Sequence, residues 1–111
     1  MNNLQPSKMR ESADAASELL AAAANRNRLM ILCHLVNREV TVTELMELVG
    51  MSQSAMSQQL AKLRAANLVA TRRNGQQIYY SLASEKVEQL LQLIYGMYCM
   101  EETQGLMLKK A

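Results

Sequence analysis

The sequence predicts a mainly α-helical fold with one small β-hairpin, the arrangement called a winged helix-turn-helix. Gly50 suits the end of one helix and Ser52 suits the start of the next. Helices joined by so short a turn must cross at a steep angle. Two β-rich runs, 68–73 and 76–82, come directly afterwards. With three further helical segments, the prediction is five helices and one hairpin.

Length and composition indicate one domain that pairs with a second copy. The chain has 111 residues, 50% of them hydrophobic, and so small a core often gains stability from association. We therefore expect a homodimer. No apolar run approaches the roughly 18 residues that a transmembrane helix needs, and no charged start leads into an apolar stretch. A soluble cytoplasmic protein without membrane contact is expected.

The first two helices follow from alanine content and capping. We expect residues 1–8, which include the only proline, to form a mobile tail. The alanine-rich segment 9–24 is typical of a helix with one apolar stripe. Asn25 can cap a second helix through its side-chain oxygen. That helix should be central, because its stripe of Leu29, Leu32, Cys33 and Val36 is widened by Met30, Ile31 and Leu35.

The third and fourth helices form the helix-turn-helix. The β-branched segment 39–42 interrupts the helical period, and Thr43 is the expected N-cap of a helix that ends at Gly50. Ser52 then opens the fourth helix. One face of that helix is apolar, with Met56, Leu60 and Leu63. The opposite face has small, uncharged side chains, namely Ser54, Ser57, Gln58 and Ala61.

A basic hairpin follows the fourth helix. The pair at 74–75, Asn-Gly, favours a two-residue type I′ turn, because both positions of that turn need positive φ. Pairing across such a turn places Arg73 opposite Gln76 and Arg72 opposite Gln77. The tip of the hairpin would then carry two guanidinium groups and two amides.

Charge and surface chemistry together indicate double-stranded DNA as a partner. The net charge is only +2, but no acidic residue lies between Glu47 and Glu85. Small polar side chains can enter a major groove and bond to base edges, whereas cations bind phosphates. Taken alone, such residues more often form an ordinary solvated surface; their position just after a tight helical turn favours DNA. The predicted base contacts are Gln53, Ser54, Ser57 and Gln58, and the predicted backbone contacts are Lys62, Arg64, Arg72 and Arg73, with Gln76 at the hairpin tip.

A strongly amphipathic fifth helix closes the domain. Ser84 suits its N-cap, and its stripe contains Val87, Leu90, Leu91, Ile94, Tyr95 and Tyr98. This stripe is too apolar to stay in water. We expect it to pack with the first helix and with the same pair from a second subunit, so that two recognition helices face a two-fold DNA site. The domain then spans 9–102, and 103–111 is a C-terminal tail.

Two cysteines, Cys33 and Cys99, allow two interpretations. They are too few for a secreted disulfide framework, and their spacing fits neither a zinc ribbon nor a Cys-x-x-Cys pair. Each can be a small core hydrophobe. Alternatively, they form a dithiol switch if the second and fifth helices bring the sulfur atoms together. Arg26, Arg28 and His34 are candidate cations for a thiolate.

The sequence predicts no cofactor, metal or catalytic activity. A tetrahedral metal site needs four ligands, and the only histidine, His34, lies about 100° around the helix from Cys33. The same angle disfavours a nucleophile and base formed by these neighbours. Neither a paired-carboxylate site nor a glycine-rich phosphate loop is apparent.

The order of elements and several segments resemble the ArsR/SmtB family of winged-helix repressors, from about Glu11 to Cys99. Residues 52–64 and their exit at 67–69 are similar to the family's recognition helix. Members commonly have His where Gln59 stands and Gly where Asn67 stands. Segments 28–33 and 75–80 resemble the family's second helix and its wing.

Within that family, the surroundings of Cys33 and Cys99 resemble the two-cysteine branch typified by BigR, SqrR and HlyU. The Cys-x-Cys and Asp/His ligands of the metal-sensing branches are missing from 44–49 and 84–98. The resemblance implies a repressor that senses reactive sulfur species or oxidants. A disulfide or polysulfide bridge between Cys33 and Cys99 would lower operator affinity, with persulfide or an oxidant as inducer.

Other functions stay open at this point. The chain could be a thiol-insensitive regulator or an anti-repressor that competes with another protein for promoter DNA. It could be a winged-helix module that binds a protein through its fifth helix, or a thiol oxidoreductase. Salt-dependent binding to duplex DNA separates the regulators from the module, and turnover of a disulfide substrate would identify the oxidoreductase.

Overall fold

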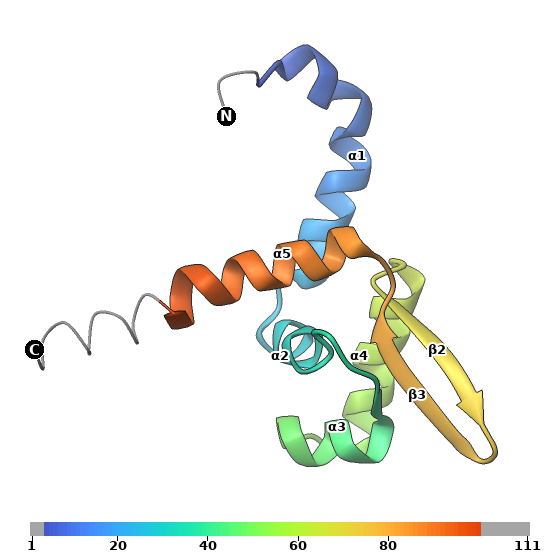
Figure 1. The fold of residues 1–111 in the computed structure, drawn as a ribbon. Coiled ribbons are helices and arrows are strands. Elements are labelled where there is room, and N and C mark those ends of the chain that lie inside the picture. The colour runs from blue at the N-terminus through green and yellow to red at the C-terminus, as the bar shows by residue number, and fades with distance from the viewer. Residues whose placement is uncertain (1–3, 101–111) are drawn as a thin grey trace, which may run out of the picture.

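The computed structural model describes residues 4–100, which contain the five expected α-helices and the hairpin (Figure 1). The elements in chain order are α1 (Pro6–Ala23), α2 (Arg26–His34), β1 (Val40–Thr41), α3 (Val42–Val49), α4 (Gln53–Ala65), β2 (Val69–Asn74), β3 (Gln77–Leu82), α5 (Glu85–Tyr95) and the π-helical turn η1 (Gly96–Met100). Strand β1 was not expected. The predicted tail 103–111 and residues 1–3 of the N-terminal tail lie outside the described residues.

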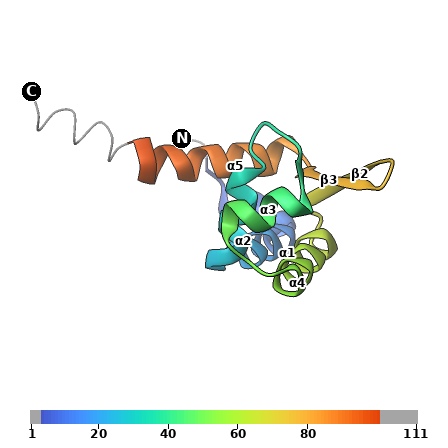
Figure 2. The ribbon, with the colours of Figure 1, turned by 90° about the horizontal axis from the view of Figure 1, so that it is seen from below.

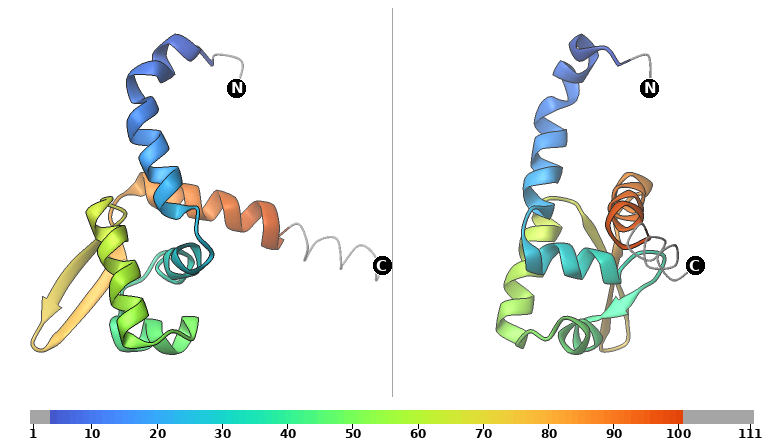
Figure 3. Two further views of the ribbon diagram at one scale, coloured as in Figure 1. Left: turned by 180° about the vertical axis from the view of Figure 1, so that it is seen from behind. Right: turned by 90° about the vertical axis from the view of Figure 1, so that its left-hand side faces the viewer.

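Helices α2, α3 and α4 surround a small core, and the β2–β3 hairpin extends from one side of it (Figure 1). Figure 2 shows α5 and the hairpin along one side of the molecule and α4 along the other. Helix α1 rises away from the core, and α5 extends past it in another direction, as both views of Figure 3 show. The most deeply buried side chains are Ile31, Leu32, Leu35, Val40, Leu45, Met56, Leu63, Leu68, Val87 and Leu91.

Helix α2 is central, as expected, but fewer of its sides are buried than the sequence suggested. Ile31 and Leu32 are fully buried and Cys33 is half-buried, whereas Met30 is 41% exposed. The helix ends at His34, before the end of its predicted stripe. Leu29, Met30 and Cys33 of α2 line a cavity that residues of α1 and α5 also line.

The helix boundaries correct two expectations and confirm a third. Helix α1 begins at Pro6, so the predicted tail is shorter; proline suits a first turn because its missing N–H is not needed there. Thr41, and not Thr43, caps α3. The Thr41 hydroxyl accepts a bond from the Glu44 N–H at 3.2 Å while the Glu44 carboxylate accepts one from the Thr41 N–H at 3.2 Å, a reciprocal capping box. Gly50 ends α3 with φ +78°, as expected.

The sheet is antiparallel with strand order β1-β3-β2. The predicted hairpin register is wrong: the turn lies one residue later than expected, so the cross-strand partner of each arginine shifts by two residues. The observed pairs at the tip are Asn74 with Gln77, Arg73 with Ile78 and Arg72 with Tyr79. Gly75 and Gln76 are therefore the turn residues, and positive φ falls on Gly75 at +65°, the first central position. This is the type II′ arrangement, in which one glycine suffices.

Candidate nucleic-acid interface and thiol site

Helix α4 presents a polar, uncharged face to solvent. Ser52 caps the helix by accepting a hydrogen bond from the Ala55 N–H at 3.2 Å. The apolar side of the helix, with Met56, Leu60 and Leu63, is buried in the core. The side chains predicted to contact bases, Gln53, Ser54, Ser57 and Gln58, are all exposed. Helical spacing therefore correctly predicted which face of α4 is buried and which is exposed.

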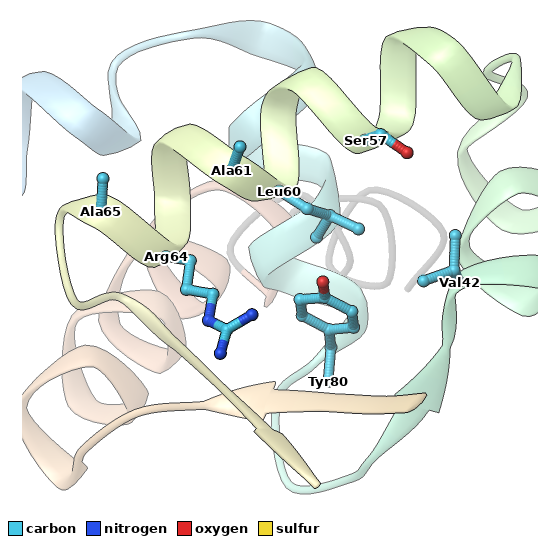
Figure 4. A pocket seen from close by; sticks show the side chains of 7 residues that line it. All are labelled: Val42, Ser57, Leu60, Ala61, Arg64, Ala65 and Tyr80. Carbon is cyan, nitrogen blue, oxygen red and sulfur yellow. The ribbon is translucent and has the colours of Figure 1, made fainter. Parts of the chain in front are cut away.

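The C-terminal half of α4 lies beside the wing. Lys62 and Arg64 are both exposed near the end of the helix. A cavity of about 380 Å³ opens between α4 and strand β3, and Ser57, Arg64 and Tyr80 are among its lining residues (Figure 4). The Arg64 side chain thus extends from α4 toward the hairpin (Figure 4).

Arg28 anchors the recognition helix to the helices behind it. Its Nε donates to the Ala22 carbonyl oxygen at 2.6 Å, and its Nη1 donates to the Gln59 Oε1 at 3.1 Å. One side chain on α2 therefore joins the end of α1 to α4. The sequence interpretation offered Arg28 as a cation for the Cys33 thiolate, but its hydrogen bonds point elsewhere.

The two wing arginines lie on opposite faces of the sheet. Side chains alternate along a strand, and Arg73 pairs with Ile78 on the face where Tyr80 meets α4. Arg72 pairs with Tyr79 on the other face. Arg73 consequently shares the side of the recognition helix, whereas Arg72 does not. Gln76 is exposed in the turn.

Arg72 is engaged within the protein, and its cross-strand partner is Tyr79 instead of the predicted Gln77. Its Nε and Nη2 each donate to one oxygen of Glu39, both at 2.9 Å. Its guanidinium carbon also lies 4.7 Å from the centre of the Tyr79 ring. The hydrogen bonds from Arg72 lower the pKa of the Glu39 carboxyl, and the same contact raises the pKa of Arg72.

Both cysteines line one apolar cavity of about 660 Å³. Cys33 is half-buried on α2, and Cys99 is exposed on η1. The other lining residues come from α1, α2, α5 and the segments that follow α1 and α5: Leu20, Ala23, Ala24, Leu29, Met30, Leu90, Ile94, Tyr95, Met97 and Tyr98. Burial raises the pKa of the Cys33 thiol, and the nearby Cys99 raises it further. Cys33 is therefore held mainly as the neutral thiol at pH 7.

The remaining candidate ligands do not gather around the thiols. His34 Nδ1 lies 3.5 Å from Nη2 of Arg38, which follows the end of α2. Arg26 is exposed at the start of α2. Within residues 4–100, no three side chains from His, Cys, Asp or Glu form a group that could hold a metal ion. In the same range, no helix is both long and apolar enough to cross a bilayer.

Large apolar side chains are uncovered along α1, α5 and η1. Leu93 is 61% exposed and Tyr98 is 66% exposed. The others on these elements are Met9, Leu20, Tyr95 and Met97. So much apolar surface on two helices that leave the core is typical of an interface.

Comparison with known proteins agrees with this geometry. The nodulation protein NolR of Rhizobium meliloti is 49% identical over 98 residues, which is 88% of this chain and 80% of NolR. The model of the bacterial regulatory protein, arsR family, matches residues 25–71. The chain belongs to the ArsR family.

Two solved structures of DNA-binding regulators are similar to this fold. The transcriptional repressor BigR from Xylella fastidiosa has a TM-score of 0.80 at 38% identity, covering 86% of this chain and 98% of BigR. The homodimeric winged helix-turn-helix DNA-binding domain of Mb0332 from Mycobacterium bovis has a TM-score of 0.72 at 31% identity, covering 87% of this chain and 89% of that domain.

Membership in the ArsR family makes this chain a DNA-binding transcriptional regulator. The family match covers α2, α3 and α4 and reaches into β2, so it contains the helix-turn-helix. The expected fold class and family resemblance are both confirmed. The ArsR-family relatives are transcriptional regulators and not enzymes.

Proposed function

We propose that this chain is a homodimeric repressor that releases operator DNA when its Cys33 and Cys99 become linked through sulfur. The observation that carries the proposal is that both cysteines line one apolar cavity, although they are far apart in sequence. The effect of Cys99 on the pKa of Cys33 also indicates that the two thiols lie within electrostatic range. The similarity to the transcriptional repressor BigR supports the assignment as a repressor.

The proposed DNA interface consists of the outer face of α4 and the wing tip. Gln53, Ser54, Ser57 and Gln58 contact bases, because they are exposed and carry donors and acceptors. Lys62, Arg64 and Arg73 contact the backbone, with Gln76 beside them. Arg72 is not included among the direct phosphate contacts, because Glu39 already occupies its guanidinium.

Helix α2 offers a route from the thiols to DNA. It carries Cys33 near its end and Arg28 near its start, and Arg28 donates to Gln59 of the recognition helix. A bridge from Cys33 to Cys99 would tie α2 to the end of α5 and change how α2 sits in the core. The Arg28 contact would pass this change to α4.

The chemistry begins at Cys99, which is exposed, and ends at Cys33. The Cys99 thiolate attacks the outer sulfur of an organic persulfide RSSH and releases RSH, which leaves a persulfide on Cys99. Cys33 loses its proton as it attacks the inner sulfur, a disulfide forms, and the outer sulfur leaves with that proton as H₂S. If each cysteine first takes one sulfur, the same attack leaves a trisulfide and expels H₂S. A peroxide ROOH instead oxidises Cys99 to a sulfenic acid and leaves ROH; condensation with Cys33 then releases water.

Mass spectrometry of the treated protein tests this sequence of events. Purified protein is treated separately with an organic persulfide and a peroxide, and each product is assayed for affinity to a duplex selected from a random-sequence library. We expect Cys99 to be modified first and bridged protein to bind the duplex weakly. Bridged protein that binds as tightly as reduced protein would contradict the proposal.

The Gln58→Ala variant tests the assignment of α4. Truncating a side chain that reads a base should reduce discrimination between the preferred duplex and single-base variants by about 1–3 kcal/mol. Arg73→Ala should instead weaken binding to all duplexes and reduce the slope of log K against log salt by about 0.9. Gln92→Ala, an exposed change on α5, is the control. Unchanged discrimination and slope in both variants would remove the assignment.

A regulator that competes for promoter DNA without responding to thiol chemistry is the second candidate. It uses the same DNA-binding surface, so only the response to persulfide separates it from the proposal. A duplex affinity of the unaltered protein that persulfide leaves unchanged would identify this second candidate.

A further inference from the structure

One ion pair connects all three strands of the sheet. Arg72 lies on β2, its guanidinium stacks on the Tyr79 ring of β3 at 4.7 Å, and it binds both carboxylate oxygens of Glu39, just before β1. Tyr79 itself pairs with Arg72 on one side and with Thr41 of β1 on the other. The arginine side chain therefore crosses β3 from one edge of the sheet to the other.

The wing has little else on this face to hold its direction. Strand β1 contains only two residues and pairs with β3 only at Tyr79 and Tyr80, so the last residues of the hairpin extend beyond it. An isolated two-stranded hairpin is only marginally stable in water. A bidentate bond between the arginine fork and a carboxylate fixes geometry as well as distance.

We propose that Glu39 and Arg72 form a clamp that sets the direction of the wing, so that Arg73 lies on the DNA side. Arg72 is then a positioning residue and not a phosphate ligand. This inference rests on the proposed DNA interface, because it assigns the wing a defined place on the duplex.

Three observations favour a clamp over a direct contact. The guanidinium already donates hydrogen bonds from Nε and Nη2 to the Glu39 carboxylate. Arg73 lies on the sheet face that meets α4, whereas Arg72 lies on the opposite face. The Glu39–Arg72 pair has no net charge, so docking it near DNA releases few counterions.

Four variants separate the two roles on the full-length protein, with the selected duplex as ligand. Arg72→Ala and Glu39→Gln remove the clamp, and Arg72→Lys keeps the charge but loses the planar fork. Glu47→Gln is the matched control, because Glu47 is an exposed carboxylate on α3 outside the sheet. The readouts are affinity, its salt slope, and amide hydrogen exchange of residues 70–74.

The clamp predicts that all three clamp variants lose operator affinity by a similar factor, about two- to fivefold for an exposed pair. Their salt slopes should match that of the unaltered protein. The Glu39→Gln/Arg72→Ala double variant should bind no more weakly than either single variant. Amides at 70–74 should exchange faster in the clamp variants, but not in Glu47→Gln or Arg73→Ala.

Several results would overturn the clamp. A slope reduced by about 0.9 in Arg72→Ala, with Arg72→Lys binding normally, would make Arg72 a phosphate ligand. Tighter binding by Glu39→Gln would make Glu39 a competitor of DNA for Arg72. If Arg73→Ala and Gln58→Ala have no effect, the DNA interface fails, and that failure is recognised independently of the clamp variants.

Discussion

A Cys33→Ser variant should bind the selected duplex equally tightly before and after persulfide treatment. In the unaltered protein, treatment should reduce affinity by about 5- to 150-fold, the range typical of coupling between two sites. Serine has no thiol, so it can form neither a disulfide nor a trisulfide with Cys99. Cys33 is half-buried beside the core, and serine is close to it in size, so the reduced fold should persist. Fluorescence anisotropy with labelled duplex measures both affinities.

The controls for this result lie in the same cavity. Cys99→Ser should lose the response as well, because the bridge needs both ends. Met30→Ala changes the lining of the cavity from α2 without removing a thiol, and it should retain the response. If both serine variants still release the duplex in persulfide, the response does not need a bridge between Cys33 and Cys99. If the unaltered protein binds the duplex equally tightly before and after treatment, the chain is a thiol-insensitive regulator.

The recognition helix could be predicted from sequence because its determinants are local. Ser52 and the apolar spacing of Met56, Leu60 and Leu63 act within one helix, and the structure has the cap and both faces as expected. Asn25 and Ser84 also cap their helices as expected. Caps and periodicity depend on residues a few positions apart, which a sequence displays directly.

The wing could not be predicted in the same detail, because its geometry depends on contacts between distant segments. The turn dipeptide at 74–75 allowed a type I′ turn, but pairing with β1 and packing of Tyr80 beside α4 accompany a different register. That shift changes the cross-strand partner of each arginine, from Gln76 to Ile78 for Arg73 and from Gln77 to Tyr79 for Arg72. Glu39 lies 33 positions from Arg72, and no local pattern marks it as a partner.

The thiol site was only partly predictable for a related reason. Helical spacing along the last helix placed Cys99 on the ridge of Leu91 and Tyr95, but the regular helix ends at Tyr95 and η1 follows. Wider π-helical winding changes the direction of every side chain after it. That both cysteines line one cavity therefore depended on the arrangement of α2 and α5 in space.

A Leu93→Glu variant should dissociate the dimer. Leu93 is 61% exposed on α5, and the structure leaves it on a helix that extends past the core (Figure 1). A carboxylate placed in an apolar interface loses its hydration and gains no partner. The free energy lost exceeds the free energy of association that one interface position contributes. We expect a monomer in analytical ultracentrifugation at micromolar concentration, with unchanged far-ultraviolet circular dichroism.

Operator affinity should decrease in parallel, because one subunit then contacts only one half-site. Two linked half-sites commonly bind about 10²- to 10⁴-fold more tightly than one, so the loss in Leu93→Glu should exceed that of any single contact on α4. Leu48→Glu is the matched control for assembly: Leu48 is 45% exposed on α3, away from α1 and α5, and that variant should stay dimeric. A dimeric Leu93→Glu protein would place the subunit interface elsewhere, because an uncovered leucine tolerates a charge and an interfacial leucine does not.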